Sequence, residues 1–327
     1  MDKKRFIEIK NGESMGIRPT MLVTYLMKDL GLVAVLLVLW NFLEPIAASL
    51  LGAPVVAVLM FRNFSFMHDA VHGAVITPRW FNDALGIWSG ALCALPFDPW
   101  KKVHLQHHHW AGNIDRDPVM LIVNKYPQWP SWLRATLSFF WKAWIPLVAC
   151  LQYSVFWYTA TKHVLKGPPS LNAILSMIVP GAFWVSMFAM APAAFLWGSV
   201  VPGVLLYLLT VEVVNLPHHL ELPQYRGDTL LPLWEQHKIA RSCLYPKWFA
   251  ENVVLNFNYH LEHHMYPGLA WYHLHRMHEI LKPELGAAYN TDPQFSWILK
   301  NRPKDLGEVL RAMEDFEMRE QGRQRAA

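Results

Sequence analysis

Four apolar stretches, each about the length of a membrane-spanning helix, alternate with polar segments along this chain. They occupy about residues 22–43, 46–66, 171–190 and 192–214. A helix of about 20 mostly apolar residues crosses the hydrocarbon core of a bilayer. Glu44 and Pro45 separate the first two stretches, and the last two are rich in Pro and Gly, which membrane helices tolerate. The pattern therefore predicts two helical hairpins and an all-α integral membrane protein with four transmembrane helices.

Two weaker apolar stretches are expected to lie at the membrane surface. Residues 84–97 are too few to span the core, which favours a re-entrant or interfacial segment. Residues 137–160 contain Lys142, Pro146 and several aromatic residues, so we expect them at the interface, with a membrane span as the alternative.

The remaining segments are polar and divide the chain into three parts. Residues 1–21 form a basic N-terminal segment, residues 22–278 form the membrane domain, and residues 279–327 form a polar C-terminal segment. An amphipathic helix is expected near residues 310–320, and we expect the whole C-terminal segment to be a solvated helical cap.

The distribution of Lys and Arg predicts the orientation. None occurs between residues 31 and 61, or between residues 167 and 225. Both predicted hairpin turns therefore lack positive charge, and the positive-inside rule places them outside the cell. The N-terminus, the C-terminus and the segment between the hairpins are then expected in the cytoplasm.

Composition agrees with a membrane enzyme that has a substantial water-facing part. The 327 residues are 53% hydrophobic and 17% charged, with a mean hydropathy of +0.15. The net charge of +4 is too small to indicate nucleic-acid binding. The three cysteines, Cys93, Cys150 and Cys243, have no spacing typical of a disulfide framework, an iron–sulfur cluster or a zinc ribbon.

Eight of the sixteen histidines fall into three compact clusters next to the apolar stretches. The clusters are His68/His72, His104/His107/His108 and His260/His263/His264. On a helix, residues at i, i+3 and i+4 share one face, and the clusters use only these spacings. Because neutral imidazole binds iron, zinc, copper and nickel, three converging faces predict a site for more than one metal ion.

Other metal-site patterns do not fit. A zinc protease needs His-Glu-x-x-His, which is absent. A carboxylate-bridged di-iron bundle needs Glu-x-x-His pairs, and neither Glu212 nor Glu221 begins one. Asp69 and Glu262 lie inside the clusters, where we expect them to orient ligand imidazoles.

The three clusters resemble the histidine boxes of the integral-membrane fatty acid desaturase superfamily over roughly residues 20–280. The resemblance implies a histidine-rich, non-heme di-iron site on the cytoplasmic cap, which reacts with O2. It also implies a further ligand after the last span, where Asn215 and His219 match an Asn-x-x-x-His spacing and the neighbouring His218 is the alternative. The expected ligands are His68, His72, His104, His107, His108, His219, His260, His263 and His264. The residues expected around them are His218, Asn215, Asn256, His109 and Asp69. Asn256 is expected to support a metal-bound water, with a capping or packing role as the alternative, and a surface position is the alternative for His109.

This resemblance implies an oxidoreductase that introduces a double bond into a fatty acyl chain. The same scaffold also suits a fatty acid hydroxylase, an acetylenase or an alkene-forming decarboxylase, which sequence spacing does not distinguish. Since the chain carries no redox module of its own, a separate electron donor of the ferredoxin, rubredoxin or cytochrome type is expected. A non-enzymatic metal transporter would need ionisable residues along its spans; Lys28, Asp29 and Glu212 lie only near span ends.

Overall fold

The computed structural model describes residues 1–166 and 168–311, apart from the side chains of Leu121, Ile122 and Arg311, and it is mostly helical. The amphipathic helix expected near residues 310–320 falls almost entirely outside the described residues. Four helices are long and apolar enough to cross a membrane. They are α2 (Pro19–Phe42), α3 (Pro45–Val71), α9 (Leu171–Met190) and the continuous run Ala193–His219.

The last of these runs is built from three successive pieces. It begins with α10 (Ala193–Phe195), passes through a π-helical turn, η2 (Leu196–Val200), and continues as α11 (Val201–His219). Both α3 and the final run extend five residues beyond the stretches expected from hydropathy. Each therefore carries histidines on its last turn, as rigid continuations of an apolar helix.

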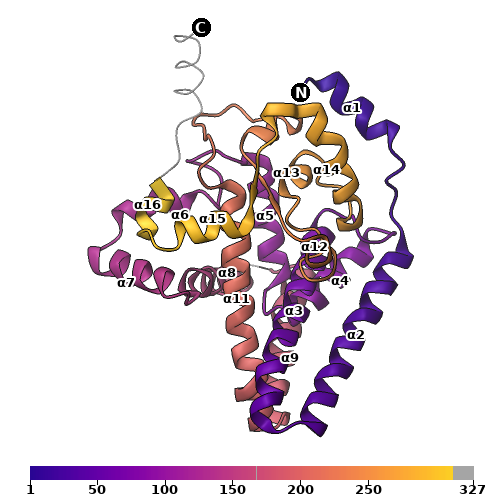
Figure 1. Ribbon diagram of the computed structural model, residues 1–327, viewed down its shortest axis with the longest axis vertical. Helices are drawn as coiled ribbons and strands as arrows, with labels where there is room; N and C mark the ends of the chain where they lie inside the picture. The colour runs from indigo at the N-terminus through magenta and orange to yellow at the C-terminus, as the bar shows by residue number, and fades with distance from the viewer. Residues whose placement is uncertain (167, 312–327) are drawn as a thin grey trace.

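The two predicted pairs pack differently (Figure 1). α3 lies against both α2 and α11, and its contact with α11 is close because Gly203 has no side chain. A Cβ at Gly203 would stand 2.6 Å from Cβ of Val56. α9 instead runs along α4 (Trp80–Leu92), where Trp184 Nε1 donates to the carbonyl of Ala91 at 2.9 Å.

The bent pair α7 (Ser131–Lys142) and α8 (Leu147–Leu165) turns through 119° at its break. α7 exposes the large apolar side chains of Trp132 and Phe139. Such a bend prevents the pair from crossing a bilayer as one straight helix. The interfacial position of residues 137–160 stays a prediction, since a bent pair of this kind is compatible with either a broken span or a re-entrant segment.

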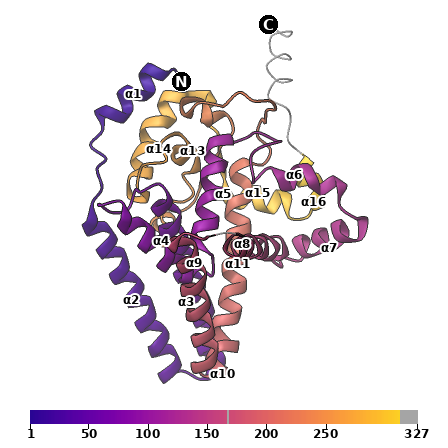
Figure 2. The ribbon, with the colours of Figure 1, turned by 180° about the vertical axis from the view of Figure 1, so that it is seen from behind.

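The other elements form a cap at one end of the long helices (Figures 1 and 2). Its helices are α1 (Lys3–Gly12), α5 (Phe97–Trp110), α6 (Leu121–Lys125), α12 (Lys247–Asn252), α13 (His260–Met265), α14 (Trp271–Leu285), α15 (Gln294–Asn301) and α16 (Leu306–Arg311). Its 3₁₀ turns are η1 (Tyr126–Gln128), η3 (Leu233–Lys238) and η4 (Gly286–Ala288). Two short strands of the cap, β1 (Ser242–Leu244) and β2 (Thr291–Pro293), pair in parallel and so connect segments that lie before and after α13 and α14 in the sequence.

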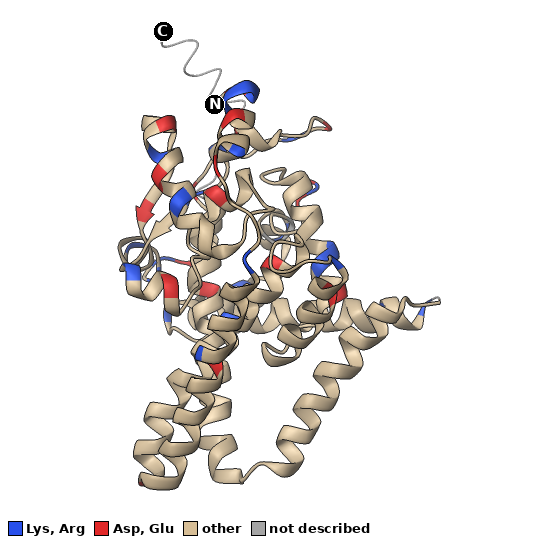
Figure 3. Cartoon of the chain, turned by 90° about the vertical axis from the view of Figure 1, so that its right-hand side faces the viewer, with Lys and Arg blue, Asp and Glu red and all other residues tan. Residues whose placement is uncertain are grey.

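Charged residues gather almost entirely in this cap, while the long helices beneath it are nearly free of them (Figure 3). Two buried arginines join the cap to the long helices. Arg62 of α3 pairs with Asp29 of α2 and also donates to the carbonyl of Asn252 in α12 at 2.7 Å, and Arg302, at the end of α15, lies 3.1 Å from Glu212 of α11. Cap and helices therefore form one connected body.

Candidate metal centre

The three histidine clusters meet where the long helices enter the cap, together with His219. His68 lies in the last turn of α3, and His72 directly follows the end of that helix at Val71; α5 and α13 each present three histidines on one face. The side chains separate into two groups of potential ligands. One group is His68, His72, His104, His108 and His263, and the other is His107, His219, His260 and His264. All nine expected ligands belong to one group or the other.

In the five-histidine group the Nε2 atoms converge. Nε2 of His104 lies 3.0 Å from Nε2 of His72 and 3.1 Å from that of His108, which is 2.9 Å from Nε2 of His263. The Nε2 atom of His68 is buried and has no hydrogen-bond partner. Its ring lies 4.2 Å from that of His263, between centroids.

The four-histidine group forms a closed ring of Nε2 atoms. From His107 the successive separations are 3.2 Å to His219, 2.9 Å to His260, 3.0 Å to His264 and 3.2 Å back to His107. Nitrogen ligands about 2.0–2.1 Å from a metal ion stand about 2.9 Å apart at right angles and about 3.4 Å apart in a tetrahedron. The ring therefore has the dimensions of a metal coordination sphere.

Hydrogen bonds on the opposite ring nitrogens show why a cation fits. Nδ1 of His107 lies 2.8 Å from Asp117, that of His219 is 3.0 Å from the carbonyl of Ile239, and that of His264 is 2.9 Å from Gln236 Oε1. These acceptors require the proton on Nδ1, so each Nε2 presents a lone pair. Lone pairs about 3 Å apart repel one another unless a cation lies between them. The residues present thus fit a bound metal ion.

Burial keeps these imidazoles in their ligand form. Burial lowers the pKa of His72 to about 3, and it holds the pKa values of the α5 and α13 ligands His104, His108, His260, His263 and His264 well below the usual range. Neighbouring imidazoles, which would repel a second positive charge, act in the same direction. Neutral imidazole is the form that binds metal.

Two supporting residues were missed in the sequence analysis because they arrive from loops. Asp117 lies ten residues after His107, and its carboxylate also accepts hydrogen bonds from the backbone N–H groups of Gly112 at 3.1 Å and Val119 at 2.9 Å. Gln236, in η3, donates to the carbonyl of His108 at 3.1 Å while accepting from His264. The only sequence signal was an Asp in the turn after the second box, and Gln236 had none.

The residues expected to support the ligands have varied surroundings. Asp69 accepts from Nδ1 of His68 at 3.0 Å and from the backbone N–H of Trp271 at 2.7 Å, as a support for a ligand should. His218 is fully buried, and its ring stacks on His260 with centroids 4.2 Å apart.

The remaining three expected supports do not reach a ligand. The Asn215 amide donates to Val211 within its own helix at 2.9 Å, and the Asn256 amide donates to the Trp271 carbonyl at 3.0 Å. His109 is exposed and lies against Trp110, which matches the surface alternative.

The expectation for Glu262 was wrong. Its carboxylate accepts hydrogen bonds from the hydroxyls of Ser242 and Tyr289, with Nδ1 of His278 at 3.3 Å, and it orients no ligand imidazole. The reason is helical geometry, because Glu262 lies two residues from His260 and His264 and so points to the opposite side of α13.

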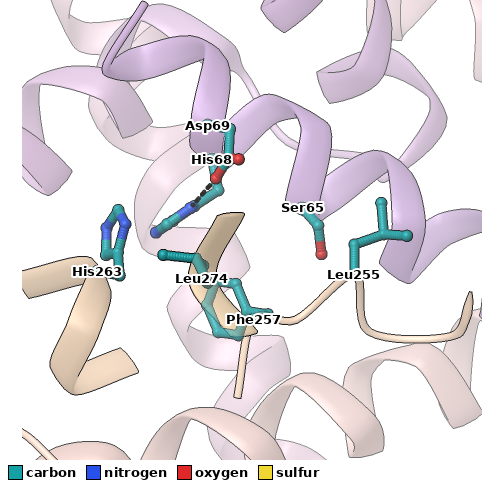
Figure 4. A pocket seen from close by; sticks show the side chains of 7 residues that line it. All are labelled: Ser65, His68, Asp69, Leu255, Phe257, His263 and Leu274. Atoms are coloured by element: carbon teal, nitrogen blue, oxygen red, sulfur yellow. Dashed lines mark hydrogen bonds and ion pairs between the residues drawn. The ribbon is translucent and has the colours of Figure 1, made fainter. Parts of the chain in front are cut away.

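A narrow void flanks the five-histidine group (Figure 4). The imidazoles of His68 and His263 lie on one side of it, and Leu255 and Ser65 lie on the other. The void is too narrow to admit a water molecule. Its lining is Ser65, His68, Asp69, Leu255, Phe257, His263 and Leu274. The candidate metal centre therefore has a dry flank, which Leu255, Phe257 and Leu274 make partly apolar.

Comparison with known proteins gives consistent matches. The family described as fatty acid desaturase matches residues 45–295. An sn-1 acyl-lipid omega-3 desaturase (ferredoxin) of Synechocystis sp. is 26% identical over 84% of this chain and 78% of its own length. An sn-1 oleoyl-lipid 12-desaturase of Picosynechococcus sp. is 24% identical over 72% of this chain and 69% of its own length. The omega-6 fatty acid desaturase, endoplasmic reticulum isozyme 1, of Glycine max is 24% identical over 69% of this chain and 63% of its own length.

Proposed function

Because this chain belongs to the fatty acid desaturase family, we propose that its two histidine groups hold two iron ions and that it uses O2 to introduce a double bond into a fatty acyl chain. The observation that carries this proposal is the pair of adjacent all-histidine groups at the base of apolar helices. Bound iron would supply the O2 and electron-transfer chemistry needed to remove hydrogen from an unactivated C–H bond, which side chains alone do not supply.

The roles of the side chains follow from their contacts. The nine imidazoles would bind the metals through Nε2, while Asp69, Asp117 and Gln236 hold protons on the opposite nitrogens. Phe257 lies with its ring centroid 4.8 Å from that of His68, so an acyl chain beside the five-histidine group would meet an apolar wall. Burial of the ligands keeps bulk water away from the reacting carbon atoms.

The substrate and the electron donor are proposed from chemistry and from the relatives. Four helices apolar enough to cross a membrane support a substrate that comes from the membrane, and the Synechocystis and Picosynechococcus relatives are named for acyl-lipid and oleoyl-lipid substrates. The name of one of them includes ferredoxin. We propose a lipid-borne acyl substrate and a separate donor of the ferredoxin, rubredoxin or cytochrome type. Both termini and the metal centre lie on the cytoplasmic side in this proposal, because the Lys and Arg residues gather in the cap.

The test is product analysis in cells that express this chain, beside cells that express His263→Ala. We expect a new unsaturated fatty acid by gas chromatography–mass spectrometry with the unaltered chain only, and two iron ions per purified protein. His163→Ala, at an exposed histidine of α8, is the matched control and should keep both. Detection of a hydroxy acid instead would indicate that the same centre catalyses hydroxylation, and a shortened alkene would indicate decarboxylation. Full activity of His263→Ala would refute the centre itself.

A further inference from the structure

The buried carboxylates of this protein divide into two sets according to what neutralises them. Asp29 and Glu212 each contact a buried arginine. A third buried arginine, Arg241, also has a carboxylate partner, since its Nε lies 3.2 Å from Asp292. Among residues 1–166 and 168–311, the other buried carboxylates form no ion pair with lysine or arginine. They are Asp69, Asp117 and Glu262.

All three of these carboxylates surround the histidine groups. Asp69 hydrogen-bonds a member of the five-histidine group, and Asp117 hydrogen-bonds a member of the four-histidine group. Glu262 lies on α13, the helix that supplies one ligand to the first group and two to the second. Each group therefore has one carboxylate of its own, and the third lies beside both.

Burying an unpaired carboxylate is unfavourable by several kcal/mol, because the charge loses its hydration. Neutral imidazoles bring no compensating charge. Two iron ions would bring at least four positive charges into the same buried region. The neutral imidazole ligands would not cancel this charge. The three carboxylates lie where such a charge would be.

We propose that the negative charges of Asp69, Asp117 and Glu262 balance the positive charge of the two bound metal ions. We also propose that the charge of Glu262 lowers the reduction potential of the metal pair through space. This inference rests on the proposed function, since it needs two bound metal ions. A nearby negative charge stabilises the more highly charged, oxidised state more than the reduced state, and this effect is strong where water is excluded. Glu262 is a positioning residue in this scheme, because it reaches the metals only through its field and through α13.

Glu262→Gln is the sharpest test, because Glu262 touches no ligand. The glutamine has the same shape, its oxygen can accept from Tyr289, and the Ser242 hydroxyl can rotate to accept from its NH2 group. In the iron-loaded full-length protein, we expect unchanged iron content and a more positive reduction potential in a spectroscopic redox titration. Glu279→Gln, which removes the same charge from a half-exposed position on α14, should leave the potential unchanged.

The outcomes separate the alternatives. An unchanged potential in iron-loaded Glu262→Gln would overturn the proposal, because Glu262 would then act only as a hydrogen-bond anchor or have its charge cancelled by a proton on His278. If Glu262→Gln loses iron, Tyr289→Phe replaces it. That variant keeps the charge but removes one donor, so the potential should become more negative, and a positive or absent change would overturn the proposal. Unaltered protein that binds no iron would refute the proposed function first, before any potential is compared.

Discussion

Gln236 shows how much the candidate metal centre depends on single side chains outside the ligand-bearing helices. It joins α5 to α13 by donating to the carbonyl of His108 and accepting from His264. Gln236→Leu keeps the volume but removes the acceptor, so His264 loses the group that fixes its tautomer. We expect metal affinity to fall about 10- to 100-fold, as measured by competition with a chelator. Gln128→Leu, at an exposed glutamine in η1, should have the affinity of the unaltered protein; an equal affinity for both variants would contradict this role.

His237, the next residue, makes stability depend on pH. Burial lowers its pKa to about 4, with a smaller effect from the N-terminal amine. The unfolded chain takes up a proton near pH 6.5 whereas the folded chain does not, so its contribution to stability is complete above pH 6.5. That contribution is lost as the pH falls toward 4. At pH 5 the loss is about 2 kcal/mol.

The measurement is the thermal unfolding midpoint at pH 7.5 and pH 5 in unaltered protein and in His237→Gln, which keeps a donor for the Trp234 carbonyl. The variant should show the smaller decrease on acidification. Equal decreases in the two proteins would mean that His237 is not the group that titrates.

The contrast between predicted and observed residues has a physical origin. Eight of the nine histidines could be recognised because ligands on a helix repeat at three- and four-residue spacing, whereas His219 was expected only from the family resemblance. Asp117, Gln236 and the carbonyl of Ile239 could not, because each is placed by a turn or a 3₁₀ segment whose path depends on the folded cap. Glu262 was misjudged for a related reason: it shares a sequence motif with the ligands but lies on the other side of their helix.

At the scale of elements, the contact between α3 and α11 holds two ligand-bearing helix ends in register. Gly203 allows this contact, since a Cβ there would stand 2.6 Å from Val56 Cβ and 2.9 Å from the Ala53 carbonyl. Gly203→Ala should separate the helices and lower stability by about 1–3 kcal/mol, with reduced iron content. Gly181→Ala in α9, where a Cβ meets nothing within 4 Å, should be neutral or slightly stabilising in the same thermal unfolding assay. Loss of stability only at Gly181 would contradict this account of the packing.

The N-terminal helix α1 packs over the segment that carries His260, His263 and His264, and we call it the N-terminal strap. Phe6 stacks on Tyr266, with ring centroids 4.4 Å apart, and Arg5 forms a two-pronged hydrogen bond with Glu284 of α14. Phe6→Ala should release the strap, because removing a buried ring costs about 3–5 kcal/mol. Trypsin cleavage after Lys10 should then become at least about tenfold faster. Ile7→Ala, at a side chain that is 42% exposed, is the matched control and should be cleaved at the original rate.

The end of a span and the end of a helix are different boundaries, and the difference matters for function. Hydropathy predicts that two spans leave the membrane core near residues 66 and 214, and α3 and α11 continue beyond these points to Val71 and His219. Conversely, α13 has only six residues, too few to be stable alone. It is held by the buried bonds of Glu262 and by Ser242 in β1. Such dependence on segments far away in the sequence is invisible to local patterns.

For the whole molecule, the concentration of Lys and Arg in the cap predicts how the protein is oriented in the membrane. The turn between α2 and α3 contains Glu44 and lies at the end of the long helices opposite the cap, whereas Asp228 is an exposed cap residue. Neither position bears on the metal ligands, so single cysteines there should report topology without disturbing the centre. Of the three native cysteines, Cys93 and Cys243 are buried, and Cys150 is replaced by Ser to remove background labelling.

We expect Glu44→Cys to react with a membrane-impermeant maleimide in intact cells, and Asp228→Cys to react only after the membrane is opened. Positive charge is retained on the cytoplasmic side during insertion, which places the cap there. The metal centre would then face the compartment that holds soluble electron donors, while its acyl substrate arrives from the membrane beneath it. Labelling of Asp228→Cys in intact cells would reverse the orientation, and an electron donor from the opposite compartment would then be required.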